Sequence, residues 1–477
     1  MPDRPNIVII TMDQLRWDAL GCVGNPVVRT PNIDRLAREG ARCEHFFVQS
    51  PVCQPSRATM FTGRYPRAHG VKWNWHNLPE RESTLAATLS DAGYHTHAIG
   101  KMHFTPIDKL HGFDDRFFVE GKMFSEYDEY RTRLREKGLV DVYFEHVKQW
   151  GNPENYGTAT FPLGDDNYVD TYIGRNAKRI ISADNREPFF YWVSFCNPHM
   201  PFDPPEPFDS MYPPESVDMP SDFPHIQHSR IPEFRTSSGQ RDFSPLTEQK
   251  LRKVIANYYG CISLVDREIG GVLDALESRG VLDDTVIIFL SDHGEMLGHR
   301  GQLWKGRMLY DHLVRVPFIV RYPPEIGGGQ IISDLVQATD IMPTILDYAG
   351  ISGAPGIQGR SIRRLIRKDE VDWRQWAFAE AGGVKMARTH TWKLIHYVGK
   401  SYGELYNLEA DPLELENLYD RPEYASKRAE MTQLLVNILI ETEDPLPEAA
   451  LGTPYEGIAG DHPQQEYGGR DRDAYLR

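Results

Sequence analysis

Thr285-Val286-Ile287-Ile288-Phe289-Leu290, continued by Ser291-Asp292-His293-Gly294-Glu295, is the stretch that decides the fold class. Its first six residues are β-branched or apolar with no polar alternation, which is typical of a strand buried on both faces. Polar and charged residues follow this run at once. We therefore predict a buried parallel strand whose end carries a group of polar side chains.

The same pattern recurs along the chain. Further strands are predicted over residues 7–12, 97–99, 189–195 and 316–321, and helices over 30–40, 84–92, 247–278 and 339–348. Gly260 and the pair Gly270-Gly271 are possible breaks in the longest of these helices. Alternating apolar strands and helices predict an α/β fold with a large, mostly parallel sheet sandwiched by helices.

Past residue 367 the pattern changes. Short segments at 376–381, 384–389 and 392–398 predict an antiparallel meander, and residues 424–441 predict a helix. We therefore predict a catalytic α/β domain over residues 1–367 and a smaller C-terminal α+β domain over 368–445. Residues 446–477 form a tail that is either disordered or packs on a neighbouring subunit as an oligomerisation arm.

Composition limits the class of protein. The net charge of −15 over 477 residues argues against a nucleic-acid binder, although local Arg, Lys and His can still bind a small anion. No apolar run reaches the roughly 18 residues of a transmembrane helix, and the run at 7–10 is too short for a signal peptide. We therefore expect a cytoplasmic protein without membrane contact. The odd number of scattered cysteines fits reduced thiols: Cys22, Cys43, Cys53, Cys196 and Cys261.

Polar residues follow the ends of four predicted strands. They are Asp13, then Lys101 and His103, then His199, and finally Asp292 and His293. A single aspartate after a strand is more often a helix cap than a ligand, but six such residues are harder to explain as caps. Ligands bind at the carboxyl edge of open α/β sheets, so we predict that these residues form one site.

The segment Cys53-Gln54-Pro55-Ser56-Arg57 is the most specific feature. A cysteine in such a turn is usually a buried apolar residue. Pro55 and Ser56, however, are typical of a helix start, which places residue 53 where free backbone N–H groups favour an anion. The segment closely resembles the sulfatase signature Cys-x-Pro-Ser-Arg, and residues 58–64 extend the resemblance.

The resemblance covers most of the chain. Gly100-Lys101-Met102-His103 is similar to the family's Gly-Lys-x-His element, and Pro198-His199-Met200-Pro201-Phe202 to its Pro-His-x-Pro-Phe element. Residues 291–295 resemble the second metal-binding segment, and Lys305 lies where a later lysine is expected. Residues 404–408 and 411–414 resemble a C-terminal strand and turn, which we interpret as structural. The chain thus resembles a formylglycine-dependent sulfatase of the alkaline phosphatase superfamily.

This resemblance implies a modified nucleophile. In that family a formylglycine-generating enzyme oxidises the cysteine, here Cys53, to formylglycine (3-oxoalanine), whose hydrated aldehyde supplies the attacking oxygen. The second hydroxyl of the hydrate lets the covalent sulfate ester be expelled by elimination, which a thiol cannot do. The resemblance therefore implies hydrolysis of an organic sulfate monoester, with a small-molecule or saccharide sulfate as substrate.

It also implies one divalent metal ion, with Ca²⁺ expected and Mn²⁺ or Mg²⁺ as alternatives, because hard oxygen ligands with one imidazole suit these cations. The implied ligands are Asp13, Gln14, Asp292, His293 and the residue-53 oxygen.

Roles follow for the remaining residues. Arg57 would hold the hydrated aldehyde, and Lys101 and Lys305 would bind sulfate oxygens. His199 would protonate the leaving alcohol and His103 would act as base, although these two roles could be exchanged.

Two positions depart from the commonest sulfatase pattern. Gln14 stands where a second aspartate is frequent, and His293 stands where an asparagine is frequent. This combination resembles the branch containing choline sulfatases and phosphonate monoester hydrolases. A phosphonate monoester or phosphodiester hydrolase is therefore the main alternative, although Lys101 with His103 favours a sulfate ester. A catalytically inactive binding protein is a third reading.

The leaving alcohol stays open among sugar, aryl and alkyl groups. Within Trp73-Asn74-Trp75 the two indoles are explained by packing, or alternatively line the substrate pocket together with Asn74. The candidate substrate-binding residues are Asn74, Lys101, His199 and Lys305.

Overall fold

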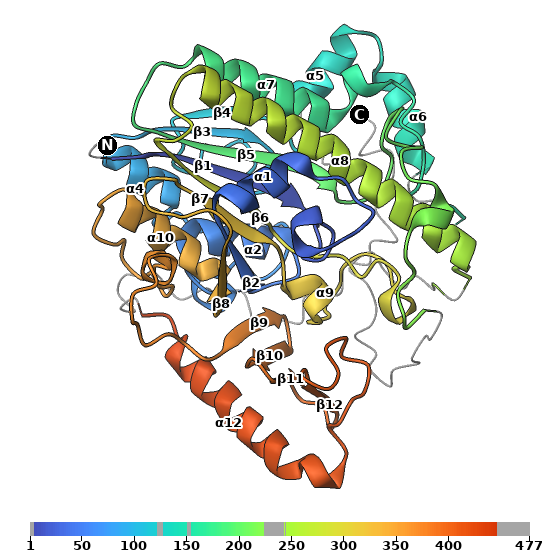
Figure 1. The fold of residues 1–477 in the computed structure, drawn as a ribbon, viewed down its shortest axis with the longest axis vertical. Coiled ribbons are helices and arrows are strands. Elements are labelled where there is room, and N and C mark those ends of the chain that lie inside the picture. The colour runs from blue at the N-terminus through green and yellow to red at the C-terminus, as the bar shows by residue number, and fades with distance from the viewer. Residues whose placement is uncertain (1–3, 122–126, 150–153, 224–242, 244, 446–477) are drawn as a thin grey trace.

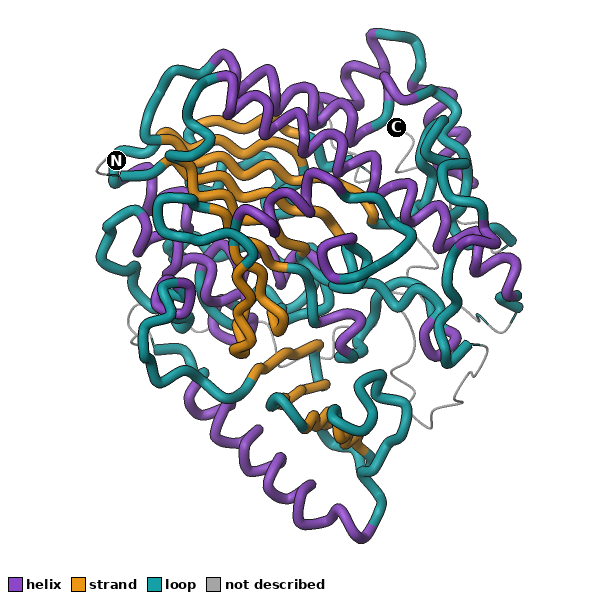
Figure 2. Tube along the Cα trace, in the orientation of Figure 1, coloured by secondary structure: helices purple, strands orange, loops and turns teal. Residues whose placement is uncertain are grey.

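A computed structural model describes residues 4–121, 127–149, 154–223, 243 and 245–445. Within them the chain forms a large eight-stranded sheet and a smaller four-stranded sheet (Figures 1 and 2). The predicted tail over 446–477 lies outside the described residues. No helix among the described residues has the length and apolar character needed to cross a membrane.

The large sheet has the order β4-β3-β5-β1-β6-β7-β2-β8. Only β7 runs antiparallel to its neighbours β6 and β2, so the sheet is mostly parallel as predicted. Its strands are β1 (Asn6–Asp13), β2 (Ala41–Phe47), β3 (His95–Gly100), β4 (Asp115–Phe118), β5 (Phe189–Pro198), β6 (Thr285–Ser291), β7 (Phe318–Arg321) and β8 (Gln330–Gln337).

Helices cover both faces of this sheet. In Figure 1, α1 (Pro31–Glu39), α7 (Val169–Ala183) and α8 (Glu248–Ser278) cross the face towards the viewer. Val8 and Ile10 of β1 pack in the apolar cluster that includes these helices, whereas Ile7 and Ile9 belong to the cluster on the other face. That second cluster contains residues of α2 (Cys53–Thr62), α4 (Leu85–Asp91) and α10 (Ile341–Tyr348). Alternate residues of one strand therefore enter two separate cores, which explains its continuous apolar run.

Short helices and 3₁₀ turns connect these elements in the described part of the chain. The remaining short α-helices of this part are α3 (Pro66–His69), α5 (Glu129–Glu136), α6 (Val140–Gln149), α9 (Asp311–Val314) and α11 (Arg363–Ile366). Single 3₁₀ turns lie at Gly21–Val23, Asp165–Asn167, Pro214–Ser216, His299–Gly301, Ala338–Asp340 and Pro422–Tyr424.

The predicted breaks in the longest helix are wrong, because α8 runs without interruption through all three glycines. A Cβ atom at Gly260 would lie 2.3 Å from the carbonyl oxygen of Phe208, and one at Gly270 would lie 2.9 Å from the Asn32 side chain. These glycines let neighbouring segments approach the helix closely.

The smaller sheet is the predicted antiparallel meander joined by a fourth strand, at the segment that resembles a C-terminal strand, in the order β12-β11-β10-β9. It comprises β9 (Ala377–Ala381), β10 (Val384–Arg388), β11 (Trp392–Tyr397) and β12 (Gly403–Asn407), and α12 (Ala425–Glu441) packs against it. Lys393 of this sheet lies 2.8 Å from the Asp311 carboxylate of α9, an ion pair buried between the two sheets. The exact domain boundary at residue 367 stays a prediction.

Candidate active site

Four neighbouring strands bring the predicted site residues to one edge. Strands β3, β5, β1 and β6 are adjacent and parallel, so their carboxyl ends meet at the same edge of the sheet. Asp13 is the last residue of β1, Asp292 follows β6, and Lys101 follows β3. His199 follows β5 directly. The four strands therefore bring Asp13, Lys101, His199 and Asp292 to the carboxyl edge of the sheet.

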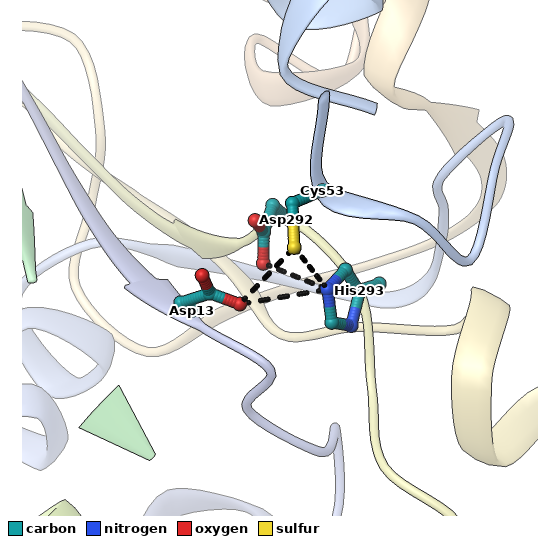
Figure 3. Close-up of side chains that lie close together, drawn as sticks. All are labelled: Asp13, Cys53, Asp292 and His293. Carbon is teal, nitrogen blue, oxygen red and sulfur yellow. Dashed lines mark hydrogen bonds and ion pairs between the residues drawn. The ribbon is translucent and has the colours of Figure 1, made fainter. Parts of the chain in front are cut away.

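Cys53 is the first residue of α2 and is buried. Its Sγ lies 2.9 Å from Nζ of Lys305, 3.1 Å from Nε2 of His293 and 3.8 Å from Oδ1 of Asp13. Figure 3 shows the cysteine side chain pointing at Asp13, Asp292 and His293. The predicted helix start thus places residue 53 among the side chains that end β1 and β6.

Buried or nearly buried cations, among them Arg57, Lys101 and Lys305, balance the carboxylates. Nε of Arg57 donates to Oδ2 of Asp292 at 2.7 Å, and its Nη2 lies 3.8 Å from Oδ2 of Asp13. Lys101 donates to the same oxygen, Oδ2 of Asp13. Burial alone would raise the pKa of the Asp13 carboxyl, but Lys101 and the other nearby cationic groups hold it well below its usual range. Asp13 is therefore ionised at neutral pH.

The thiol of Cys53 is a weak nucleophile in this setting. Burial raises its pKa above the ordinary value, and the negative charge of Asp13 adds to the effect, while Lys305 and Lys101 oppose it. Since the thiolate rather than the thiol attacks electrophiles, the site does not prepare a sulfur nucleophile at neutral pH.

His293 turns its Nε2 towards the carboxylates, Lys305 and residue 53. Its Nδ1 lies 2.9 Å from the carbonyl oxygen of Gly294, which accepts a hydrogen bond, so Nε2 is the unprotonated nitrogen. Burial, followed by the charge of Lys305, lowers the pKa of His293 to about 4. Its Nε2 lies 3.5 Å from Oδ1 of Asp13 and 3.8 Å from Oδ1 of Asp292.

These separations fit the ligands of a single cation. One ligand atom each from Asp13, residue 53, Asp292 and His293 lies within 4.8 Å of the others. Two carboxylates and one neutral imidazole suit a hard or borderline divalent ion. The donor set therefore fits the metal that the resemblance implies.

Glu295 belongs to this site although no role was predicted for it. It is fully buried, and it accepts hydrogen bonds from the side-chain amide of Gln14 and from the backbone N–H groups of Leu297 and Trp304. The other end of the Gln14 amide, Oε1, accepts from Lys305 Nζ at 3.0 Å. Glu295 thus orients Gln14. The sequence could have indicated Glu295, because it lies only three residues after the predicted metal ligand Asp292.

The two candidate proton-transfer groups differ in their surroundings. His103 is buried, and among the described residues neither of its ring nitrogens has a hydrogen-bond partner. Burial, Lys101 and Arg57 lower its pKa well below the ordinary value, so it is neutral at working pH. His199 is only half-buried, and its Nδ1 lies 2.7 Å from the carbonyl oxygen of Met200.

The Trp73-Asn74-Trp75 segment lies beside the nucleophile helix. Oδ1 of Asn74 accepts from the backbone N–H of Gln54 at 3.2 Å. The side chain of Trp75 is 54% exposed, and its ring packs edge-on against His103 with a centroid separation of 6.0 Å. Trp75 is therefore not a core residue. Trp73 is packed instead, with the guanidinium of Arg307 over its ring.

Comparison with known proteins agrees with this geometry. The family model described as sulfatase matches residues 5–351, and one described as the C-terminal part of N-sulphoglucosamine sulphohydrolase matches residues 298–441. An arylsulfatase of Clostridium perfringens is 31% identical over 92% of this chain and 95% of its own length. A choline-sulfatase of Rhizobium meliloti is 30% identical over 90% of this chain and 85% of its own. The crystal structure of a phosphonate monoester hydrolase from Agrobacterium radiobacter superposes with a TM-score of 0.77, at 25% identity, covering 92% of this chain and 96% of that one.

The fold and the residues at its carboxyl edge define an ester hydrolase of the alkaline phosphatase superfamily. Within that superfamily the chain belongs to the sulfatase family, and it is a sulfuric ester hydrolase.

Proposed function

We propose that this enzyme cleaves an organic sulfate monoester through an oxygen nucleophile carried by residue 53, after oxidation of Cys53 to formylglycine. The observation that carries the proposal is the position of residue 53, buried at the start of α2 and within 4 Å of Asp13, His293 and Lys305. A hydrated aldehyde there supplies the attacking oxygen and a second hydroxyl for releasing sulfate. The modification requires a formylglycine-generating enzyme as maturation partner.

The sulfate group is held by cations. The ammonium group of Lys101 contacts Asp13, and that of Lys305 contacts the residue-53 side chain. Arg57 contacts the carboxylates of both Asp13 and Asp292. Positive groups fixed in advance stabilise the charge on the sulfate oxygens as the ester bond breaks. Their buried surroundings make each of these interactions stronger than it is in water.

Proton transfer falls to the two histidines. His103 is neutral, buried and without a hydrogen-bond partner in the described part of the chain, so it is suited to take the proton from the residue-53 hydroxyl when sulfate is released. His199, half-buried and held through Nδ1 by the Met200 carbonyl, is suited to give a proton to the leaving alcohol. This assignment keeps the roles predicted from the sequence.

A divalent metal completes the site. Asp13, Gln14, Asp292 and His293 would hold it beside residue 53, where it would polarise the sulfate oxygens and favour an ionised nucleophile. We propose Ca²⁺, with Mn²⁺ and Mg²⁺ as the alternatives, because three of the four side-chain donors are oxygens.

The leaving alcohol is proposed to contact Asn74 and Trp75. Asn74 is hydrogen-bonded next to residue 53, and the exposed ring of Trp75 lies against His103. Exposed aromatic rings beside a polar site suit the apolar faces of sugars and aryl groups. An N-acetylglucosamine-6-O-sulfatase of Bacteroides thetaiotaomicron is 29% identical over 91% of this chain, so a sugar sulfate is a reasonable first substrate class to test.

Two measurements test the proposal. Intact-mass analysis of the peptide containing residue 53, after co-expression with a formylglycine-generating enzyme, should show the aldehyde instead of the thiol. The converted protein should then release sulfate from sugar or aryl sulfates, whereas the Cys53→Ala variant should not. A thiol that persists in an enzyme with full sulfate release would show that the nucleophile is wrong.

Phosphorus esters are the second candidate substrate class. They are supported by the similarity to phosphonate monoester hydrolase, and by Gln14 and His293, which differ from the commonest sulfatase pattern. Matched aryl sulfate, phosphonate and phosphodiester substrates separate the two by kcat/KM. We expect the sulfate to be preferred, because Lys101 and His103 are both present at the site. A higher kcat/KM for the phosphonate would reverse this assignment.

A further inference from the structure

A second cluster of metal-ligating side chains lies at the opposite end of β3. His95 and His97 are two residues apart on this strand and therefore project from the same face. Asp115 of the edge strand β4 pairs in register with His97. One ligand atom from each of the three residues lies within 4.8 Å of the others.

Two nitrogens in this cluster are buried without a hydrogen bond. The His95 side chain is nine-tenths buried at 10% exposure, and its Nε2 lies 3.4 Å from Oδ2 of Asp115 and 3.4 Å from Oδ2 of Asp184. Nδ1 of His97 is also buried and lacks a hydrogen-bond partner among the described residues. Buried polar atoms without a hydrogen bond destabilise the folded state. A cation between them would satisfy both.

We propose that His95, His97 and Asp115 form a binding site for a borderline transition-metal dication, for which Zn²⁺ is the natural probe. Tetrahedral zinc with bonds of about 2.0–2.1 Å places its ligand atoms about 3.4 Å apart, the separation found here between His95 and both carboxylates. Two imidazoles with one carboxylate favour this class of ion over Ca²⁺ or Mg²⁺. Asp184 or water fills the fourth position.

The charges and exposure around the cluster suit a bound cation. Burial lowers the pKa of His97 to about 4, so its imidazole is neutral and can act as a ligand at pH 7. The Asp115 side chain is half exposed, which gives an ion access from solvent. Arg186 is the competing cation, because its guanidinium lies 3.5 Å from Asp115 and donates to Asp184 at 2.8 Å.

This site is separate from the catalytic one. Six residues of extended chain separate His95 from Lys101, which corresponds to about 20 Å. In Figure 1, β3 and β4 form the upper edge of the large sheet, and the amino ends of the parallel strands point towards the N-terminus at the left. A metal here would join the four-residue edge strand β4 to β3 and to Asp184 at the end of α7. Its role is to hold this edge of the sheet together.

Zinc binding by the full-length protein tests the inference. Equilibrium dialysis is run with excess Ca²⁺, and bound zinc per chain and the melting temperature are measured. The His97→Gln and Asp115→Asn variants should each lose one zinc equivalent, or bind it at least about 10-fold more weakly, and lose the zinc-dependent rise in melting temperature. The control His396→Gln, on β11, should behave like the wild type.

A variant of the catalytic site distinguishes zinc bound there from zinc bound at the sheet edge. The Asp292→Asn variant should lose a different equivalent and keep the zinc-dependent stabilisation of the sheet edge. If His97→Gln does not fold, Asp115→Asn decides the question, because it keeps the size of the side chain. Equal zinc content and equal stabilisation in the wild type and in these variants would overturn the proposal, whatever the substrate of the catalytic site is.

Discussion

The side-chain amide of Gln14 donates a hydrogen bond to the carboxylate of Glu295, and both side chains are buried. The same amide accepts from Lys305 through its oxygen. An amide meets both neighbours because it is a donor at one end and an acceptor at the other, whereas a carboxylate at position 14 would face Glu295 with a second negative charge. Glu295 therefore explains why glutamine suits this position.

Replacing that amide should disturb the metal site. We expect Gln14→Glu to weaken metal affinity by about 10- to 100-fold, because the new carboxylate is repelled by Glu295 and loses the hydrogen bond that orients the side chain. The double variant Gln14→Glu/Glu295→Gln exchanges donor and acceptor and should recover most of the loss. Metal titration of the apo protein measures both. Equal affinity in Gln14→Glu and the wild type would show that the pair has no part in metal binding.

Loss of the Lys305 ammonium should slow the chemical step. It lies 2.9 Å from the residue-53 side chain and 2.9 Å from Nε2 of His293, so we expect Lys305→Met to lower kcat by about 100- to 1,000-fold. Lys178→Met, which removes a half-exposed lysine from α7, is the matched control and should leave kcat unchanged. Steady-state kinetics on the aldehyde-converted enzymes compare them. A small effect of Lys305→Met would remove this lysine from the site chemistry.

The two histidines should respond differently to the leaving group. If His199 protonates the alcohol, His199→Ala should slow alkyl or sugar sulfates by about 100-fold or more and affect nitrophenyl sulfate far less. His103→Ala should slow the release of sulfate for every substrate to a similar degree. The dependence of kcat/KM on the pKa of the leaving alcohol, together with burst kinetics, separates the roles. The reverse pattern would exchange them.

Metal removal should abolish activity and lower stability. A metal that binds only the folded protein stabilises it, and Asp13, Asp292 and His293 share the proposed ion, so a chelator should lower the melting temperature as well as kcat. Adding back Ca²⁺, Mn²⁺ or Mg²⁺ in turn should restore both, and the ion that does so at the lowest concentration identifies the preferred metal. Full activity after exhaustive chelation would contradict the assigned ligands.

Acid should destabilise the protein through His69. The backbone N–H of Val71 donates to its Nδ1 at 3.1 Å, so Nε2 carries the proton and donates to Thr59 Oγ1 of α2 at 3.1 Å. Burial, followed by the charge of Arg64, lowers the pKa of His69 to about 3, against about 6.5 in the unfolded chain. Because only the unfolded chain takes up this proton, stability present at pH 7.5 is lost as the pH falls below 6.5.

The expected loss from this group is about 2 kcal/mol between pH 7.5 and pH 5. Urea unfolding at the two pH values measures it. His69→Gln is less stable at pH 7.5 but should show a flatter pH dependence, whereas His396→Gln should retain the wild-type slope. An unchanged slope in His69→Gln would assign the acid sensitivity to other groups.

The sequence alone predicted the strands that carry the site. The runs that became β1, β5 and β6 are apolar throughout because both faces of the sheet are covered, and each is followed directly by its polar residues. Local chemistry also predicted residue 53 at a helix start, since proline and serine favour that position. The large parallel sheet and the smaller antiparallel one followed from the spacing of these elements.

Other elements were not predicted from the sequence. Strand β2 lies towards the sheet edge and mixes Arg42, Glu44 and His45 with apolar residues, so its pattern is weaker than that of a central strand. Strands β4 and β8 were missed as well. Short or partly exposed segments have little apolar periodicity, and their pairing with neighbours decides their structure. Helix α7 was also missed, although its buried Val169, Ile173, Ala177 and Ile181 recur every four residues, a spacing that predicts a helix.

Tertiary structure alone decided which side chains meet. The order of β3, β5, β1 and β6 brings residues 13, 101 and 292 to one point, although they are far apart in the chain. It also sets Gln14 against Glu295, and Asp115 of β4 beside the two histidines of β3. Sequence determines which residues end each strand, because that depends on local apolar runs. Which strands become neighbours depends on how the whole core packs, and so the contacts of both sites emerge only in the fold.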